Sequence, residues 1–254
     1  MSKSDPVRSN YYSNVERAEK ASDLLFLLSA LLSFAVLFVD KTTPRLYQGM
    51  NVVFTACVLA SFICGLALRL YLIPRAEQAR RGDFFSTAFD VGLTVERTDG
   101  YYNNAFVEPF KRTAAQLFEN TLFTKAITGK MAVRERIKVA MYFGAWLVCL
   151  LWRDVEIGIV VAACQAVFSE QMLSKLLRLE WLRIQSERVY DKMQQLFQST
   201  ATKTGFMAIT LDALLIYETA KANASITFPS KLFDKMNPSL TEQWTRTQAT
   251  FGIP

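Results

Sequence analysis

Histidine is absent from this chain of 254 residues, and cysteine, proline and glycine are scarce, with 4, 7 and 10 copies. Without histidine the chain lacks the usual general base, the commonest zinc ligand and every Ser-His or Cys-His catalytic arrangement. The glycines form no GxGxxG or GxxxxGK[ST] loop, and the carboxylates form no visible catalytic pair. We therefore expect no enzymatic activity, no metal site and no cofactor.

The cysteines and the N-terminal tail exclude two further features. All the cysteines lie within apolar stretches and show no CxxC spacing, so we expect free thiols that pack as small apolar side chains. The tail before Ala21 contains acidic residues, and no small-residue cleavage site follows the first apolar run. This tail is therefore not expected to be a removable signal peptide.

Long apolar runs are the main feature that is present. Hydrophobic residues make up 51% of the chain, and they are clustered rather than spread periodically. The runs Ala21–Val39 and Val52–Ile73 contain one charged residue each, Asp23 and Arg69. Both runs approach the roughly 20 residues that cross a bilayer core. They predict two transmembrane helices.

A second pair of apolar runs is shorter. Val139–Trp152 and Val155–Phe168 are separated only by Arg153 and Asp154. Each run is shorter than the roughly 17–25 residues of a full span, although helical flanks at 134–138 and 169–173 can extend them. The pair predicts a second transmembrane hairpin, and a buried or re-entrant helical hairpin is the alternative.

The distribution of basic residues predicts the orientation. The tail, the central segment and the C-terminal part are rich in Lys and Arg, whereas the two presumed outer loops hold only Lys41, Arg45 and Arg153. Cytoplasmic loops of membrane proteins carry the excess of Lys and Arg. An even number of spans, four rather than three, would place both termini and the central segment in the cytoplasm.

Together these patterns predict an all-α integral membrane protein with four transmembrane helices and a helical cytoplasmic module. Within that module we expect helices over 108–129, ended by Gly129, over 169–198 as an extension of the fourth span, and over 206–222. The predicted parts are a cytoplasmic tail (1–20), a first hairpin (21–73), a central sensor or coupling segment (74–137), a second hairpin (138–173) and a C-terminal helical region (174–254).

The net charge of +6 does not indicate binding to DNA or RNA polymers. Between residues 75 and 136 basic and acidic residues nearly balance, unlike the dense basic surface that duplex nucleic acid requires. The excess is typical of a membrane protein next to anionic lipid. A small anionic ligand bound by a few arginines is compatible with it.

The segment 76–104 is unusually polar and aromatic for this chain. Arg80 and Arg81 are explained equally well as interfacial anchors, Asp83 as a helix or turn cap, and Tyr101 with Tyr102 as packing beneath a turn. Taken together with two asparagines, they supply guanidinium groups for phosphate, aromatic rings for base stacking and amides for base edges. The candidate ligand-binding residues here are Arg80, Arg81, Asp83, Tyr101, Tyr102, Asn103 and Asn104.

Several motifs in this order resemble the SMODS-associated four-transmembrane effector family. They are RRGDFFSTAFDVGL at 80–93, GYYNN at 100–104, FENTLFT at 118–124 and FPSKLFDKMNPSL near the end. The first apolar hairpin precedes them, and the second hairpin with a long helix lies before the last motif. The resemblance extends over residues 11–247. It implies a membrane effector of bacterial anti-phage operons of the CBASS type. A cyclic oligonucleotide would activate it, and the effector would compromise the inner membrane and stop growth of the infected cell.

Further candidates complete this hypothesis. Glu119 and Asn120 are expected to assist ligand binding, and Gln165 and Glu170 are candidate pore or gate residues, although Glu170 is explained equally well as the start of the cytoplasmic extension. Small residues recur every four positions in the second and fourth spans, which favours helix association and a homo-oligomer, most simply a tetramer. The alternatives are a small ion channel or transporter and a constitutive structural membrane protein. The sparse ionisable residues in the spans argue against a transporter.

Overall fold

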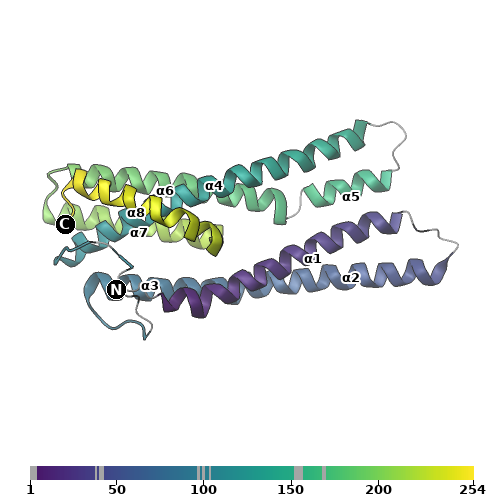
Figure 1. The fold of residues 1–254 in the computed structure, drawn as a ribbon, viewed down its shortest axis with the longest axis horizontal. Coiled ribbons are helices and arrows are strands. Elements are labelled where there is room, and N and C mark those ends of the chain that lie inside the picture. Colours follow the sequence, from purple (N-terminus) through teal and green to yellow (C-terminus); the bar gives the residue numbers. More distant parts are fainter. Residues whose placement is uncertain are drawn as a thin grey trace. The chain divides into compact units, whose positions relative to one another are not determined.

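The computed structural model describes residues 5–37, 39, 43–95, 98, 101–102, 104–151, 157–167 and 170–254. Over these residues all regular secondary structure is helical, so the predicted all-α class is confirmed (Figure 1). In chain order the elements are η1 (Arg8–Tyr12), α1 (Ser13–Leu37), α2 (Pro44–Ala67), η2 (Leu68–Leu72), α3 (Ile73–Phe89), α4 (Pro109–Leu151), α5 (Ile157–Val167), η3 (Glu170–Ser174), α6 (Lys175–Gln198), α7 (Lys203–Ala224) and α8 (Ser230–Phe251), where η denotes a π-helical turn.

The chain divides into two compact units, each assembled from separate stretches of sequence. The first unit contains Met1–Asn14, Ile73–Met131 and Arg178–Pro254, and the second contains Val15–Leu72 and Ala132–Leu177. The chain passes from one unit to the other after residues 14, 72, 131 and 177. The turns η1, η2 and η3 each end within a few residues before one of these points.

The second unit exposes its apolar side chains. Its helices α1 and α2 form an antiparallel hairpin (Figure 1), in which the thiol of Cys64 lies 3.4 Å from the carbonyl oxygen of Ala18. Leu31, Phe62 and Ile63 are each more than half exposed. A helix that is apolar on all sides and unburied is typical of a membrane environment.

One continuous helix, from Pro44 to Phe89, is long and apolar enough to cross a bilayer. Only 6% of its most apolar window is buried within the chain. Among the described residues no other helix meets both conditions of length and hydropathy. Membrane association is therefore supported at the level of this helix, and four spans remain a prediction.

This helix continues past the end of the apolar run, through Pro74, to Phe89. Proline has no N–H to donate to the preceding turn and usually ends or kinks a helix. The π-helical turn Leu68–Leu72 comes directly before it, and a widened turn is a recognised way for a helix to accommodate such an interruption.

The expectation that Gly129 ends a helix is wrong. Helix α4 runs without a break from Pro109 to Leu151. Glycine costs a helix interior only about 1 kcal/mol relative to alanine, and Met131 and Ala132, which follow the exposed Lys130, are buried. Their packing outweighs the local preference of glycine for a helix end.

The first unit has a conventional apolar core around Phe118 of α4, which is fully buried. Its ring lies 4.8 Å from that of Tyr190, 5.9 Å from Phe197, 5.6 Å from Trp244 and 5.6 Å from Phe251, measured between centroids. These partners belong to α6 and α8, which lie alongside the first half of α4 together with α7 (Figure 1). Aromatic pairs at such distances add to the stabilisation by burial.

Candidate functional site

Arg80 of α3 is held by carboxylates and aromatic rings inside the first unit. Its Nη2 donates to Asp5 Oδ1 at 3.0 Å and Oδ2 at 2.8 Å, and Nη1 lies 3.8 Å from Asp83 Oδ2. The guanidinium carbon lies 4.7 Å from the ring centroid of Tyr101 and 5.7 Å from that of Tyr12. The side chain is only 14% exposed. In this arrangement Arg80 fastens α3 to the N-terminal segment through Asp5.

A second ionic contact anchors the start of α3 to α7. Lys221 Nζ lies 2.5 Å from Glu77 Oε2, and Tyr12 donates its hydroxyl hydrogen to Glu77 Oε1 at 2.8 Å. Glu218 lies 3.5 Å from the same ammonium group. Three segments that are distant in sequence therefore meet at one buried charge pair.

The pKa values of this pair show that both groups are held in their charged forms. Burial favours the neutral form of Glu77, but Lys221, Tyr12 and Arg80 together lower its pKa below the ordinary value. Burial likewise acts against charged Lys221, but Glu77 and Glu218 raise its pKa well above the ordinary value. Burial is also the main reason that the pKa of Tyr12 is raised. The contact is a true ion pair rather than a neutral hydrogen bond.

Asp83 was considered above as a helix or turn cap, and the structure places it inside α3. It is fully buried, and its carboxylate accepts hydrogen bonds from Thr98 N at 2.8 Å and Thr98 Oγ1 at 2.7 Å. Asp83 thereby ties the segment that follows α3 back onto the helix. Asp83 positions the loop, and both bonds are made within the chain rather than to a ligand.

Tyr101 and Tyr102 lie edge to face, with ring centroids 4.9 Å apart, and Tyr102 makes a similar contact with Phe84 at 5.7 Å. Burial raises the pKa of both tyrosines. The charge of Glu119 also raises the pKa of Tyr101, and a side-chain hydrogen bond with Asn120 acts in the opposite direction on the pKa of Tyr102. The candidates Arg80, Asp83, Tyr101, Tyr102, Glu119 and Asn120 are therefore brought into one neighbourhood, between α3, the loop after it and α4.

Arg81 points to a different surface. Its side chain is 51% exposed, and its Nε lies 3.8 Å from Glu218 Oε2. Arg81 is therefore more exposed than Arg80, the other arginine predicted to bind the ligand. Neighbouring residues on a helix face different directions, and the two arginines, both expected to bind phosphate, have different partners: Asp5 for Arg80 and Glu218 for Arg81.

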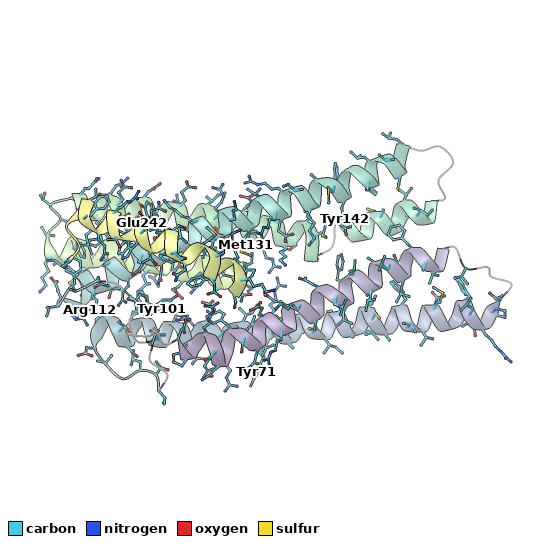
Figure 2. All side chains as sticks on the ribbon, in the orientation of Figure 1. Tyr71, Tyr101, Arg112, Met131, Tyr142 and Glu242 are labelled. Atoms are coloured by element: carbon cyan, nitrogen blue, oxygen red, sulfur yellow. The ribbon has the colours of Figure 1, made fainter. Side chains whose placement is uncertain are left out.

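A cavity of about 240 Å³ opens beside this cluster. It lies between the end of α3, the loop that precedes α4 and the first turns of α4, and Arg112 at its edge is labelled in Figure 2 together with Tyr101. Arg112 donates from Nε to Phe106 O at 2.8 Å and from Nη1 to Thr87 O at 3.1 Å. These bonds brace the loop against α3 at the side of the cavity. The cavity is lined by Thr87, Tyr102, Asn104, Phe106, Arg112 and Gln116, among others.

The polar groups at the cavity are not satisfied by the protein. Gln116 is fully buried, and neither its Nε2 nor its Oε1 has a hydrogen-bond partner among the residues that the structure describes. Within the same residues Asn104 Oδ1 is buried and unpaired as well. Leaving one such group unsatisfied costs about 1–3 kcal/mol. Structures that retain this cost usually do so at functional positions.

Three predicted residues are outside this description. Asn103 lies outside the described residues, and so do the side chains of Gln165 and Glu170, whose backbones belong to α5 and η3. Their assigned roles stay predictions. Groups of three or more His, Cys, Asp or Glu residues that could hold a metal ion are not found in the described part of the chain.

The sequence analysis did not identify Gln116 and Arg112 at the cavity. It also did not identify the ion-pair clamp, by which we mean the pairs Arg80–Asp5 and Glu77–Lys221 that hold α3. The first two were detectable, because 112, 116, 119 and 120 share one face of α4. A polar row on a helix that otherwise packs inward is a recognisable pattern. The members of the clamp were not detectable, because they come from segments that only the fold brings together.

Comparison with models of protein families, with curated proteins and with solved structures gave no match. The resemblance to the SMODS-associated effectors stays a prediction. Function is therefore argued from the chemistry of the site and from the helix that leads to it.

Proposed function

We propose that this protein is a membrane effector of bacterial anti-phage defence, which a cyclic oligonucleotide activates to disrupt the inner membrane. The observation that carries the proposal is the single helix from Pro44 to Phe89. Its first part is apolar and unburied, and its last part carries Arg80 and Asp83. The resemblance of the motifs supplies the class of ligand and the setting in phage defence.

Activation proceeds through a change in the packing of α3. The ligand binds at the cavity between α3 and α4 and favours one arrangement of α3 over another, which is all that coupling requires. The turn η2 lies between α3 and the apolar part of the same helix, and π-helical turns occur frequently at functional sites. The ion pairs Arg80–Asp5 and Glu77–Lys221 keep α3 in the resting arrangement until the ligand binds.

In the membrane we propose four spans with both termini in the cytoplasm and assembly into a homo-oligomer, with a tetramer favoured. Four helices of one chain enclose no aqueous channel, so several chains are needed for a conducting path. Gln165 and Glu170 are the proposed pore residues. Gln165→Leu is expected to change ion leakage from activated liposomes and to leave ligand affinity unchanged; an unaltered leak removes Gln165 from the gate.

The binding step is tested by calorimetry on the purified chain with cyclic di-, tri- and tetranucleotides. We expect one ring to bind and to trigger dye release from liposomes that contain the protein. Tyr102→Ala, at the cavity, should weaken binding, whereas Arg246→Ala, at an exposed pair with Glu242, should bind like the wild type. If no ring binds, the proposed function is wrong.

A test in cells separates this proposal from its alternatives. An effector is tolerated when it is expressed alone and becomes lethal only together with an enzyme that makes its ligand. A structural protein is harmless in both settings, and a transporter changes growth only with its solute. Lethality of the chain alone would contradict the proposed resting state.

A further inference from the structure

The cavity beside Gln116 has the size of a subsite rather than of a complete binding site. Its volume of about 240 Å³ is below the roughly 300–1,000 Å³ that drug-sized ligands occupy. A cyclic oligonucleotide cannot enter it as a whole. One base can enter, with the sugar–phosphate ring remaining outside at the mouth.

The walls of the cavity suit a flat heterocycle. Tyr102 and Phe106 supply aromatic side chains, on which bases of every kind stack. Gln116 contributes an amide whose donor and acceptor are both buried and unpaired, and Asn104 adds an unpaired acceptor. The Gln116 amide can therefore pair with a ligand group that carries one hydrogen-bond donor next to one acceptor.

Arg112 and Gln116 are the two side chains of the cavity that the known base contacts allow us to compare. A guanidinium reads guanine by giving two hydrogen bonds to O6 and N7, whereas the amide of Gln or Asn makes the matching pair with adenine N6 and N7. Both Nε and Nη1 of Arg112 already donate to backbone carbonyl oxygens, those of Phe106 and Thr87. Two of its five N–H groups thereby brace the loop, whereas the amide of Gln116 has no partner among the described residues. Gln116 is therefore the better suited of the two side chains to read the base.

We propose that this cavity is an adenine subsite, in which Gln116 pairs with the N6 and N7 edge of one base and Tyr102 stacks on it. The inference rests on the proposed function, because it specifies a base of the cyclic oligonucleotide. Gln116 and Phe106 then belong to the binding site together with Tyr102 and Asn104. The ligand must contain at least one adenine.

A purely structural Gln116 predicts a different response to mutation. Gln116→Leu keeps nearly the same volume and removes two unsatisfied buried atoms, so the ligand-free protein should melt at a higher temperature than the wild type. The same variant should lose the ligand. Higher stability with lost binding is the signature of a group that is kept for a ligand.

The experiment compares cyclic di-, tri- and tetraadenylate with the matching guanylate and uridylate rings on the full chain in detergent, by calorimetry and by thermal shift. For wild-type protein we expect an adenylate ring to bind at least tenfold more tightly than the other rings of its size. Gln116→Leu should lower the affinity for that adenylate ring by about 10- to 100-fold, as expected for loss of a bidentate base contact. Gln116→Met should do the same, and Gln195→Leu, at an exposed glutamine of α6, should change neither binding nor preference.

The outcomes separate this inference from the proposed function. If rings bind but guanylate or uridylate is preferred, or if both Gln116 variants bind the adenylate ring like the wild type, the adenine subsite is wrong and the effector function stands. If no ring of any base binds to the wild type, the effector function is wrong and the subsite with it.

Discussion

Phe118 in the first unit is fully buried, whereas Phe62 in the second unit is 63% exposed, although both lie on long helices of the same chain. The rings around Phe118 come from α6 and α8, so its burial is provided by the protein. Phe62 lies on the Pro44–Phe89 helix, whose most apolar window is only 6% buried. The difference shows that the first unit folds against itself, whereas the apolar surface of the second unit is suited to lipid.

The largest expected effect separates these two phenylalanines. Phe118→Ala should lower the free energy of unfolding by about 3–5 kcal/mol, because it leaves a large cavity in a packed core. Phe62→Ala should change the stability of the first unit by less than about 0.5 kcal/mol. Chemical denaturation of the protein in detergent, followed by tryptophan fluorescence, measures both. Equal losses would contradict the distinction between the units.

The ion pair between Glu77 and Lys221 provides the next test. Lys221→Met leaves the carboxylate of Glu77 buried without its cation and should destabilise the first unit by about 3 kcal/mol. The double variant Glu77→Leu, Lys221→Met removes both charges and should recover most of this loss. A double variant as unstable as the single one would show that the pair itself, rather than the abandoned charge, carries the stability.

Asp83 and Asp212 compare a buried carboxylate with an exposed one. Asp83→Ala removes two hydrogen bonds to Thr98 and should cost about 1.5–3 kcal/mol, as for bonds to a charged group. Asp212 pairs with Lys192 at the surface, and Asp212→Ala should cost about 0–1 kcal/mol. Proteolysis of the loop after α3 should accelerate only in the Asp83 variant. Equal susceptibility of both variants would remove Asp83 as the anchor of that loop.

The smallest effect near neutrality concerns pH. Because folding lowers the pKa of Glu77, its contribution to stability is present above the ordinary value of 4.5 and is lost as pH falls below it. Because folding raises the pKa of Lys221, its contribution is present below the ordinary value of 10.5 and is lost as pH rises above it. The melting temperature should therefore decline on both sides of this range, and both declines should be shallower in the double variant. Superimposable profiles would exclude the pair as their source.

Much of the helical architecture could be predicted from the sequence. The helix predicted over 206–222 corresponds to α7 (Lys203–Ala224). The helix predicted over 169–198 corresponds to η3 (Glu170–Ser174) followed by α6 (Lys175–Gln198) over the described residues. Two local rules failed, because Gly129 and Pro74 both lie inside continuous helices. In each case neighbouring residues decided the outcome, through packing after Gly129 and through a π-helical turn before Pro74.

The candidate site was predicted only in part. Tyr102 and Asn104 line the cavity as the aromatic and amide pattern suggested, but Arg80 is occupied by Asp5 and Arg81 faces another surface. Gln116 was not anticipated, although it belongs to the polar row at 112, 116, 119 and 120 of α4. That its amide is buried and unpaired among the described residues is visible only in the structure.

By itself, the sequence determined the helical class and the clustering of apolar residues into long runs, and it provides the polar, aromatic segment next to one of them. These are properties of near neighbours in the chain, which periodicity and hydropathy express directly. Only the tertiary structure decided which charges pair and which polar atoms are left alone. Glu77 meets Lys221 and Arg80 meets Asp5 across large separations in sequence, and no partner for the Gln116 amide is found in the described part of the chain. Desolvation and hydrogen bonding depend on every group around an atom, so the chemistry of this site arises only when the helices assemble.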